Sequence, residues 1–207
     1  MRRRKTGYIL LALLVITGLA GTYHSSLSTK ERKTAISYLK ETKNLLLTTV
    51  DGLNKAQLDF KPAADKWSIR QCIEHLVITE KNTSEIALRN LQQPSEPARR
   101  NEIAIKDEEI IQEITQPSLQ PLSAASIPQP VTRHINTNGR HIDEFKSLRE
   151  KNINFLKTTT ADLRNHFIEY PAVGTMDNYQ LLLMLAAHTR QYTMLITEIK
   201  SNPDFPK

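Results

Sequence analysis

Cysteine is almost absent from this sequence, and the shortage limits how the chain can be held together. Cys72 is the one cysteine among 207 residues, so an intramolecular disulfide is excluded. The chain is nevertheless long enough to bury a hydrophobic core without cross-links. Because Cys72 falls on the apolar face of a predicted helix, we expect its thiol to be buried rather than reactive.

Several short motifs of well-known enzyme classes are also missing. The sequence has no glycine-rich phosphate loop, no G-x-S-x-G nucleophile elbow, no H-E-x-x-H zinc motif and no C-x-x-C pair. It shows neither the apolar–polar alternation of strands nor the turn signals of hairpins. No internal repeat is visible. We therefore expect helices and no strand.

Basic residues are in excess, but the excess is not spread over the chain. Lysine and arginine number 28 against 22 acidic residues, which gives a formal net charge of +6. Four of these positive charges come from residues 2–5, so the rest of the chain carries only a small excess. A nucleic-acid-binding face needs a clustered excess of lysine and arginine. Nucleic acid is therefore not a predicted partner.

The N-terminal segment has the pattern of an export signal. Basic residues 2–5 are followed by an apolar run from Tyr8 to about Ala20 and then by Gly21 and Thr22. The run is slightly shorter than the roughly 20 apolar residues of a transmembrane helix. We predict that residues 1–24 are a signal peptide or an uncleaved N-terminal membrane anchor. The rest of the chain is then exported, to the periplasm or another extracytoplasmic space.

Apolar residues recur at helical spacing in four long segments of the exported part. These segments begin near Thr29, at Ser68, near Arg140 and near Asp177. Asp51-Gly52 ends the first one. A short helix is expected at about Ile105–Ile114. The segments 53–66 and 163–176 are expected to be connections, and the proline-rich segment 117–130 suits a long crossover. The sequence thus predicts an all-α, four-helix bundle with a long crossover connection over residues 29–203.

Two histidines and one tyrosine are the candidate site residues. His188 and Tyr192 lie one turn apart on the apolar face of the last helix, and His75 lies near the edge of the apolar stripe of the second. Two imidazoles facing each other in a bundle are good ligands for zinc, nickel or another first-row metal. A catalytic zinc usually has three protein ligands. Tyr192 can be the third only if the metal lowers its pKa from about 10.

The other interpretation of these residues is that they are ordinary core side chains. A histidine on an apolar helix face can simply have its ring nitrogens satisfied, and a tyrosine can pack its ring. Trp67 is expected to cover the end of the bundle as a staple or lid. Glu80 is expected to point away from the apolar face. His134 and His141 are expected in a surface turn, and His166 in a connection.

Four segments of the sequence, in this order and spacing, resemble the DinB-like (damage-inducible) superfamily. Residues 67–76, WSIRQCIEHL, are similar to its first signature, in which a tryptophan precedes a helix start and a His-Leu pair. Residues 170–176, YPAVGTM, are similar to the connection before its last helix. Residues 187–193, AHTRQYT, are similar to its second signature, in which one histidine follows another by four residues. Residues 202–206, NPDFP, are similar to its C-terminal tails.

The resemblance implies a four-helix bundle with a long crossover, and in many members a dimer. It also implies a divalent metal bound by three histidines, and for some members a transferase activity that depends on low-molecular-weight thiols. Carried over by position, the ligands are His75, His188 and Tyr192. The third position departs from the family pattern, because it holds a phenol. The export signal is a second departure.

The functional expectation combines these observations. We expect an exported DinB-like domain with a degenerate or altered divalent-metal site, which serves as a binding or accessory protein for a small-molecule ligand. One alternative is a metal-dependent transferase or hydrolase acting on a small molecule. Another is a structural or interaction protein that uses the segment 117–130 to meet a partner. A homodimer, and membrane attachment through an uncleaved N-terminal segment, are further expectations.

Overall fold

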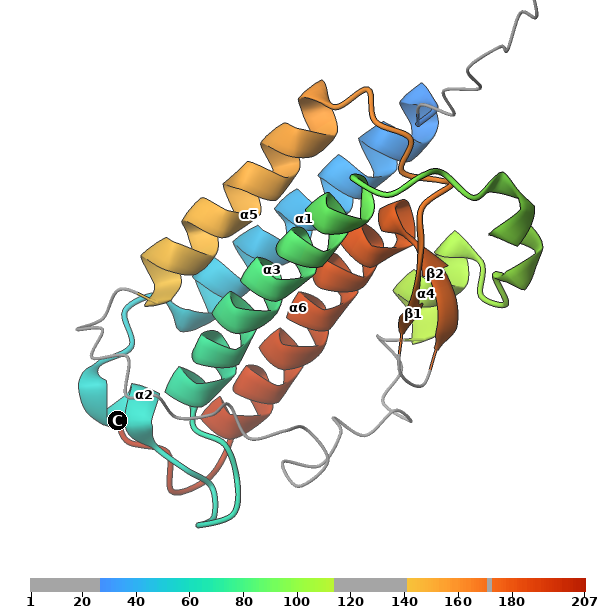
Figure 1. The fold of residues 1–207 in the computed structure, drawn as a ribbon. Coiled ribbons are helices and arrows are strands. Elements are labelled where there is room, and N and C mark those ends of the chain that lie inside the picture. The colour runs from blue at the N-terminus through green and yellow to red at the C-terminus, as the bar shows by residue number, and fades with distance from the viewer. Residues whose placement is uncertain (1–26, 114–140, 171–172) are drawn as a thin grey trace, which may run out of the picture.

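Four long helices make up a bundle in the computed structural model of the protein, which describes residues 27–113, 141–170 and 173–207. They are α1 (Thr29–Val50), α3 (Ile69–Asn90), α5 (His141–Thr158) and α6 (Asn178–Lys200) (Figure 1). The predicted all-α, four-helix fold is confirmed. The predicted signal or anchor in residues 1–24, the proline-rich segment 117–130 and His134 lie outside the described residues.

The helices pack in a ring of neighbours in which α1 contacts α6, α6 contacts α3, α3 contacts α5 and α5 contacts α1 (Figure 1). Pairs of bonded residues give the directions. Tyr179 bonds Glu31 and Lys200 bonds Thr49, so α1 and α6 run parallel. The pairings of α5 with α3 also advance together along both helices, from 141 with 74 to 152 with 84. Parallel neighbours need a connection that returns along the bundle, which accounts for the predicted long crossover between α3 and α5.

Side-chain caps fix where the helices begin. Ser28 and Glu31 form a capping box at α1, Ser68 and Gln71 form one at α3, and Asp177 with Gln180 forms one at α6. In each box two backbone N–H groups at the helix start gain acceptors. The predicted cap at Ser68 is confirmed, and Asp177 rather than its neighbour caps the last helix.

Two predicted connections contain regular structure. The segment 163–176 includes a hairpin of β1 (Phe167–Tyr170) and β2 (Gly174–Asp177), paired from Phe167 with Asp177 to Tyr170 with Gly174. The expectation of no strand was therefore wrong, because four-residue strands are too short to show alternation. The segment 53–66 holds the short helix α2 (Lys55–Asp59), capped by Asn54. The crossover contains a 3-10 helix, η1 (Pro97–Glu102), and α4 (Asp107–Glu113).

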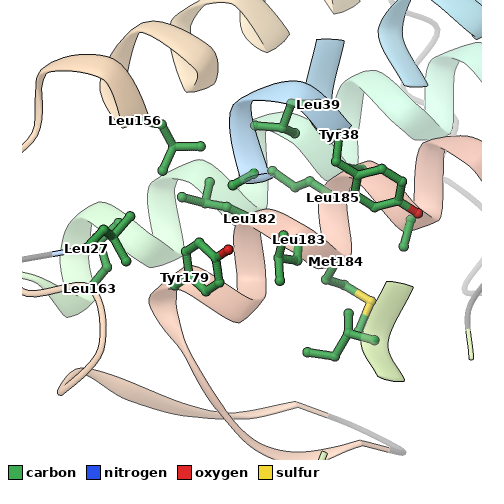
Figure 2. Close-up of a cluster of buried hydrophobic side chains, with 14 of the residues drawn as sticks. Leu27, Tyr38, Leu39, Leu156, Leu163, Tyr179, Leu182, Leu183, Met184 and Leu185 are labelled. Atoms are coloured by element: carbon green, nitrogen blue, oxygen red, sulfur yellow. The ribbon is translucent and has the colours of Figure 1, made fainter. Parts of the chain in front are cut away.

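The core is divided into two clusters along the bundle. The first joins α1, α5 and the N-terminal half of α6. Within it, side chains of the parallel helices α1 and α6 pack between one another (Figure 2). The second joins the N-terminal half of α3 to the C-terminal half of α6 and includes Trp67, Cys72 and Tyr192. Cys72 has no exposed surface, as predicted. The burial of each fully buried leucine in these clusters stabilises the folded state by about 2 kcal/mol.

Within the described ranges, no helix is both long enough and apolar enough to cross a membrane.

Candidate functional site

The three candidate residues come together between α3 and α6. The ring centroids are 5.0 Å apart for His75 and His188, and 4.7 Å apart for Tyr192 and each histidine. Trp67, just before α3, joins them, with its ring 5.3 Å from that of His75 and 5.8 Å from that of Tyr192. We call Trp67, His75, His188 and Tyr192 the ring cluster. The antiparallel packing of α3 on α6 places these residues at one level of the bundle.

The two imidazoles approach each other through the same type of atom. His75 Nε2 lies 3.3 Å from His188 Nε2 and 3.4 Å from Thr79 Oγ1. Two nitrogens bound to one tetrahedral zinc ion at 2.0–2.1 Å lie about 3.3 Å apart. The separation in the protein therefore fits two ligands of one ion. It also fits a hydrogen bond between two neutral imidazoles, in which one Nε2–H donates to the other Nε2.

Burial sets the protonation states of these rings. It lowers the pKa of His75 to about 4. It lowers the pKa of His188 to about 3, and the positive charge of Arg149 and the neighbouring His75 add to this effect. Burial also raises the pKa of Tyr192 above its ordinary value of 10. At neutral pH the cluster thus has two uncharged imidazoles and a protonated phenol.

Several polar atoms of the ring cluster have no partner in the protein. Among the described residues, five buried side-chain polar atoms lack a hydrogen bond, and three of them are Trp67 Nε1, His188 Nδ1 and Tyr192 OH. An unsatisfied buried polar group costs about 1–3 kcal/mol. Such groups are rare in native structures, and a bound molecule or ion that meets them is one of the reasons for which they occur. The free phenol oxygen beside two imidazoles is therefore compatible with a ligand site.

A third strong metal ligand is not found beside the two histidines. In the described part of the chain, His, Cys, Asp and Glu side chains form no group of three or more that could hold a metal. Cys72 is near Tyr192, but burial raises the pKa of its thiol to about 12, so it stays protonated. The residues present fit two nitrogen ligands, with Tyr192 as the available oxygen. Its role as a ligand stays a prediction.

A second buried polar cluster lies beside the ring cluster, and the sequence did not indicate it. Arg149 of α5 has no exposed surface, and its guanidinium bonds groups on the other three helices. Nε donates to Glu80 Oε1 over 2.8 Å, Nη1 donates to Thr42 Oγ1 over 2.9 Å, and Nη2 donates to Thr189 Oγ1 over 2.6 Å. We call Arg149, Glu80, Thr42, Thr189 and Asn152 the Arg149 hub.

The expectation that Glu80 points away from the apolar face was wrong. Its side chain is 1% exposed, and its second oxygen accepts a 2.8 Å bond from Asn152 Nδ2. A buried carboxylate is tolerated because a buried guanidinium and an amide pair with it. Arg149 lies four residues after Phe145 and four before Ile153, both buried. That spacing was the available signal that Arg149 faces inward.

Of the histidines that the structure describes, His141 and His166 lie outside the ring cluster, whereas Trp67 belongs to it. His141 was expected in a surface turn, but it is buried at the start of α5, with Nε2 3.1 Å from Glu74 Oε1. Both ring nitrogens of His166 face backbone carbonyl oxygens, at 2.7 and 3.0 Å. Trp67 is buried, as expected of a lid, and it covers the imidazole of His75. Neither His141 nor His166 belongs to the ring cluster.

Comparisons with known proteins bear on the family and the fold. The family model of the DinB superfamily matches residues 38–192, a range that includes the whole ring cluster. A solved structure, YfiT from Bacillus subtilis, is described as a probable metal-dependent hydrolase with an unusual four-helix bundle topology. It is 18% identical, with a TM-score of 0.55, over 85% of this chain and 89% of that one. At that identity the likeness shows the fold. No curated protein matches the chain.

Proposed function

The chain belongs to the DinB superfamily, and on that premise we propose that the ring cluster is an altered divalent-metal centre in a domain that binds a small molecule. His75 and His188 supply two imidazole nitrogens, and Tyr192 stands where a third ligand is expected. The observation that carries the proposal is the 3.3 Å separation of the two Nε2 atoms. That spacing suits zinc or nickel held by two neutral imidazoles.

Each residue of the cluster has a separate task in this proposal. His75 and His188 offer lone pairs without competition from protons, because burial keeps both rings neutral. Trp67 packs edge-on against the imidazole of His75 and helps to hold that ring in place. Tyr192 presents a hydroxyl at the same level of the bundle. A bound ion supplies a Lewis acid that polarises an oxygen of the ligand.

The replacement of a third imidazole by a phenol favours binding over turnover. A phenol becomes a strong ligand only after it loses its proton, and burial raises the pKa of Tyr192. We therefore expect the centre to hold a divalent ion more weakly than a three-histidine site. A binding or accessory protein tolerates weak occupancy better than an enzyme that depends on the ion.

The second candidate is a metal-dependent hydrolase or transferase. Two protein ligands leave open positions on an ion for a water and a substrate atom, and the description of YfiT names such a hydrolase. The two candidates share the same nitrogen ligands. They differ in whether the bound ion is stoichiometric and whether its removal abolishes a reaction.

Export and assembly form a separate part of the proposal. The basic residues 2–5 and the apolar run after them support export of the domain to an extracytoplasmic space. Residues 1–24 are then either removed as a signal peptide or kept as a membrane anchor. A homodimer is proposed from the family alone. Fractionation of cells with N-terminal sequencing of the mature chain tests the first point, and light scattering tests the second.

Metal titration of the full-length wild type and three variants tests the centre. We expect zinc and nickel to bind the wild type by isothermal calorimetry, and binding to disappear in His188→Ala. Tyr192→His restores a third imidazole and should raise the affinity at least about tenfold. His141→Gln, which changes a buried histidine outside the ring cluster, is the matched control and should bind as the wild type does. Absence of binding to the wild type, or no gain from Tyr192→His, contradicts the proposal.

A further inference from the structure

The unpartnered atoms of the ring cluster indicate what kind of ligand it binds. Trp67 Nε1 is a donor only, and the phenol of Tyr192 donates as long as it keeps its proton. Trp67 is 6% exposed and Tyr192 is 2% exposed, so bulk water does not satisfy either group. The site therefore offers two buried donors, and a ligand that matches them must carry acceptor atoms.

The charges around the ring cluster also favour a ligand that carries acceptor atoms. Both oxygens of Glu80 are already occupied by Arg149 and Asn152. Glu74 pairs with His141 on the neighbouring helix. The described residues thus place no free carboxylate beside the two imidazoles, consistent with the absence there of a group of three acidic, histidine or cysteine side chains.

A divalent ion held by two neutral imidazoles therefore keeps its charge uncompensated by the protein. The buried charge costs free energy unless an anion pairs with it. The ligand must therefore carry negative charge to pair with the ion and acceptor atoms to meet the donors. The simplest anion of this kind has two adjacent oxygen atoms, of which one faces the ion and the other faces a donor.

We propose that the ring cluster binds a small carboxylate, with Trp67 Nε1 and Tyr192 OH donating hydrogen bonds to it beside the His75–His188 pair. This proposal rests on the proposed function, because the carboxylate shares the site with the ion. The flat rings that surround the donors favour an acid with a short or aromatic carbon skeleton. Thr79, whose hydroxyl lies 3.4 Å from His75 Nε2, is half-buried and adds one more hydroxyl beside the histidine pair.

Trp67 provides a direct probe of this site because it is the one tryptophan of the chain. We would titrate the purified full-length protein with acetate and with benzoate, in zinc-loaded and metal-free form, and follow the tryptophan fluorescence. Benzyl alcohol, which keeps the aromatic ring and lacks the charge, is the ligand control. We expect saturable changes with both carboxylates, stronger with zinc present, and none with benzyl alcohol.

Two tyrosine variants separate the proposed hydrogen bond from general effects. Tyr192→Phe removes the donor and should weaken carboxylate binding about tenfold, the usual effect of losing a hydrogen bond to a charged group. Tyr38→Phe is the matched control, because Tyr38 also has a buried hydroxyl without a partner but lies in the other core cluster. Its carboxylate affinity should be unchanged. Trp67→Phe, followed by calorimetry, tests the second donor and should also weaken binding.

The outcomes distinguish this proposal from the one it rests on. If zinc binds but neither carboxylate does, the ligand is wrong and the metal centre stands. If the carboxylates bind and zinc does not, the metal centre is wrong and the ligand stands. Benzyl alcohol binding as tightly as benzoate, or equal carboxylate affinity in wild type and Tyr192→Phe, overturns the carboxylate proposal.

Discussion

The Arg149 hub and the ring cluster both draw polar side chains from α3 and α6, yet they differ in one respect. Glu80 follows His75 by five residues on α3, and Thr189 follows His188 directly on α6. In the hub, the guanidinium and both oxygens of Glu80 have partners. In the ring cluster, three polar atoms have none. The comparison shows that this fold can satisfy buried polar groups close to the ring cluster, and it sets the three unpartnered atoms beside the two imidazoles apart as the candidate site.

The contrast also shows two different consequences of burying polar side chains, one for the arrangement of the helices and one for ligand binding. Arg149 ties α5 to the other three helices, through Glu80 on α3, Thr42 on α1 and Thr189 on α6. Such a network fixes how the helices are placed relative to each other, although replacing it with apolar residues can cost little stability. The unpartnered atoms of the ring cluster instead cost folding free energy, which the proposed ligand would offset by meeting them. Four predictions test this difference.

The largest effect is expected from breaking the hub. Arg149→Met leaves the carboxylate of Glu80 buried without its cation, which should cost about 3–5 kcal/mol of unfolding free energy. The double variant Arg149→Met with Glu80→Leu removes both charges and should regain most of that loss. Urea denaturation of the two proteins measures the difference. A single variant that loses less than about 1 kcal/mol would show that the hub is not the tie described above.

The next effect concerns pH and comes from the ring cluster. The folded pKa values of His75 and His188, about 4 and about 3, lie below the unfolded value of 6.5. Between about pH 6.5 and pH 4 these two rings take up protons only in the unfolded chain. Their contribution to stability therefore falls as pH falls, by up to about 1.4 kcal/mol per pH unit for each ring.

The double variant His75→Leu with His188→Leu isolates this contribution from that of the acidic residues. Its unfolding free energy, measured in urea at pH 7, 6 and 5 without metal, should depend less on pH than that of the wild type. Equal slopes for the two proteins would mean that the histidines are not neutral and buried in the folded state.

A smaller effect distinguishes two hydroxyls that lie one turn apart on α6. Thr189→Val removes an acceptor of Arg149 and should cost about 1–2 kcal/mol. Tyr192→Phe removes a hydroxyl without a partner and should leave stability unchanged or raise it by up to about 1 kcal/mol. Thermal and urea unfolding of the metal-free proteins compare them. A loss in Tyr192→Phe as large as that in Thr189→Val would remove the contrast between the clusters.

The smallest effect uses Cys72 as a reporter of opening. Its thiol has no exposed surface, and burial raises its pKa to about 12. A thiol reagent at pH 8 should therefore react only after the bundle opens. We expect slow labelling in the wild type and in Tyr192→Phe, and faster labelling in Arg149→Met. Fast labelling of the wild type would contradict the burial of this half of the core.

Much of the fold and the convergence of the site could be predicted from periodicity and capping residues. The four helices, the cap at Ser68 and the inward direction of His188 follow from spacing alone. The helix pattern also named His75 as a candidate partner of His188. The resemblance to the DinB superfamily aligned positions 75, 188 and 192 as one ligand set, which the pattern alone could not do because the sequence of one helix does not determine its rotation against another.

The features that sequence reasoning missed share a physical cause, which is dependence on tertiary partners. Arg149 and Glu80 are charged, and their burial becomes reasonable only once they are known to face each other. The hairpin around Gly174 is too short for a period to appear, and it forms because it packs beside the start of α6. His141 is buried because Glu74 lies opposite it.

Metal content per chain tests the central claim most directly. The full-length wild type and His188→Ala would be purified without chelators, equilibrated with zinc or nickel, desalted and analysed for both elements. The account predicts that the wild type retains a substoichiometric amount of zinc or nickel, as expected of a weakened centre, and that His188→Ala retains clearly less. A wild type without metal after this treatment, or equal metal in both proteins, would contradict the claim that the ring cluster is a metal centre.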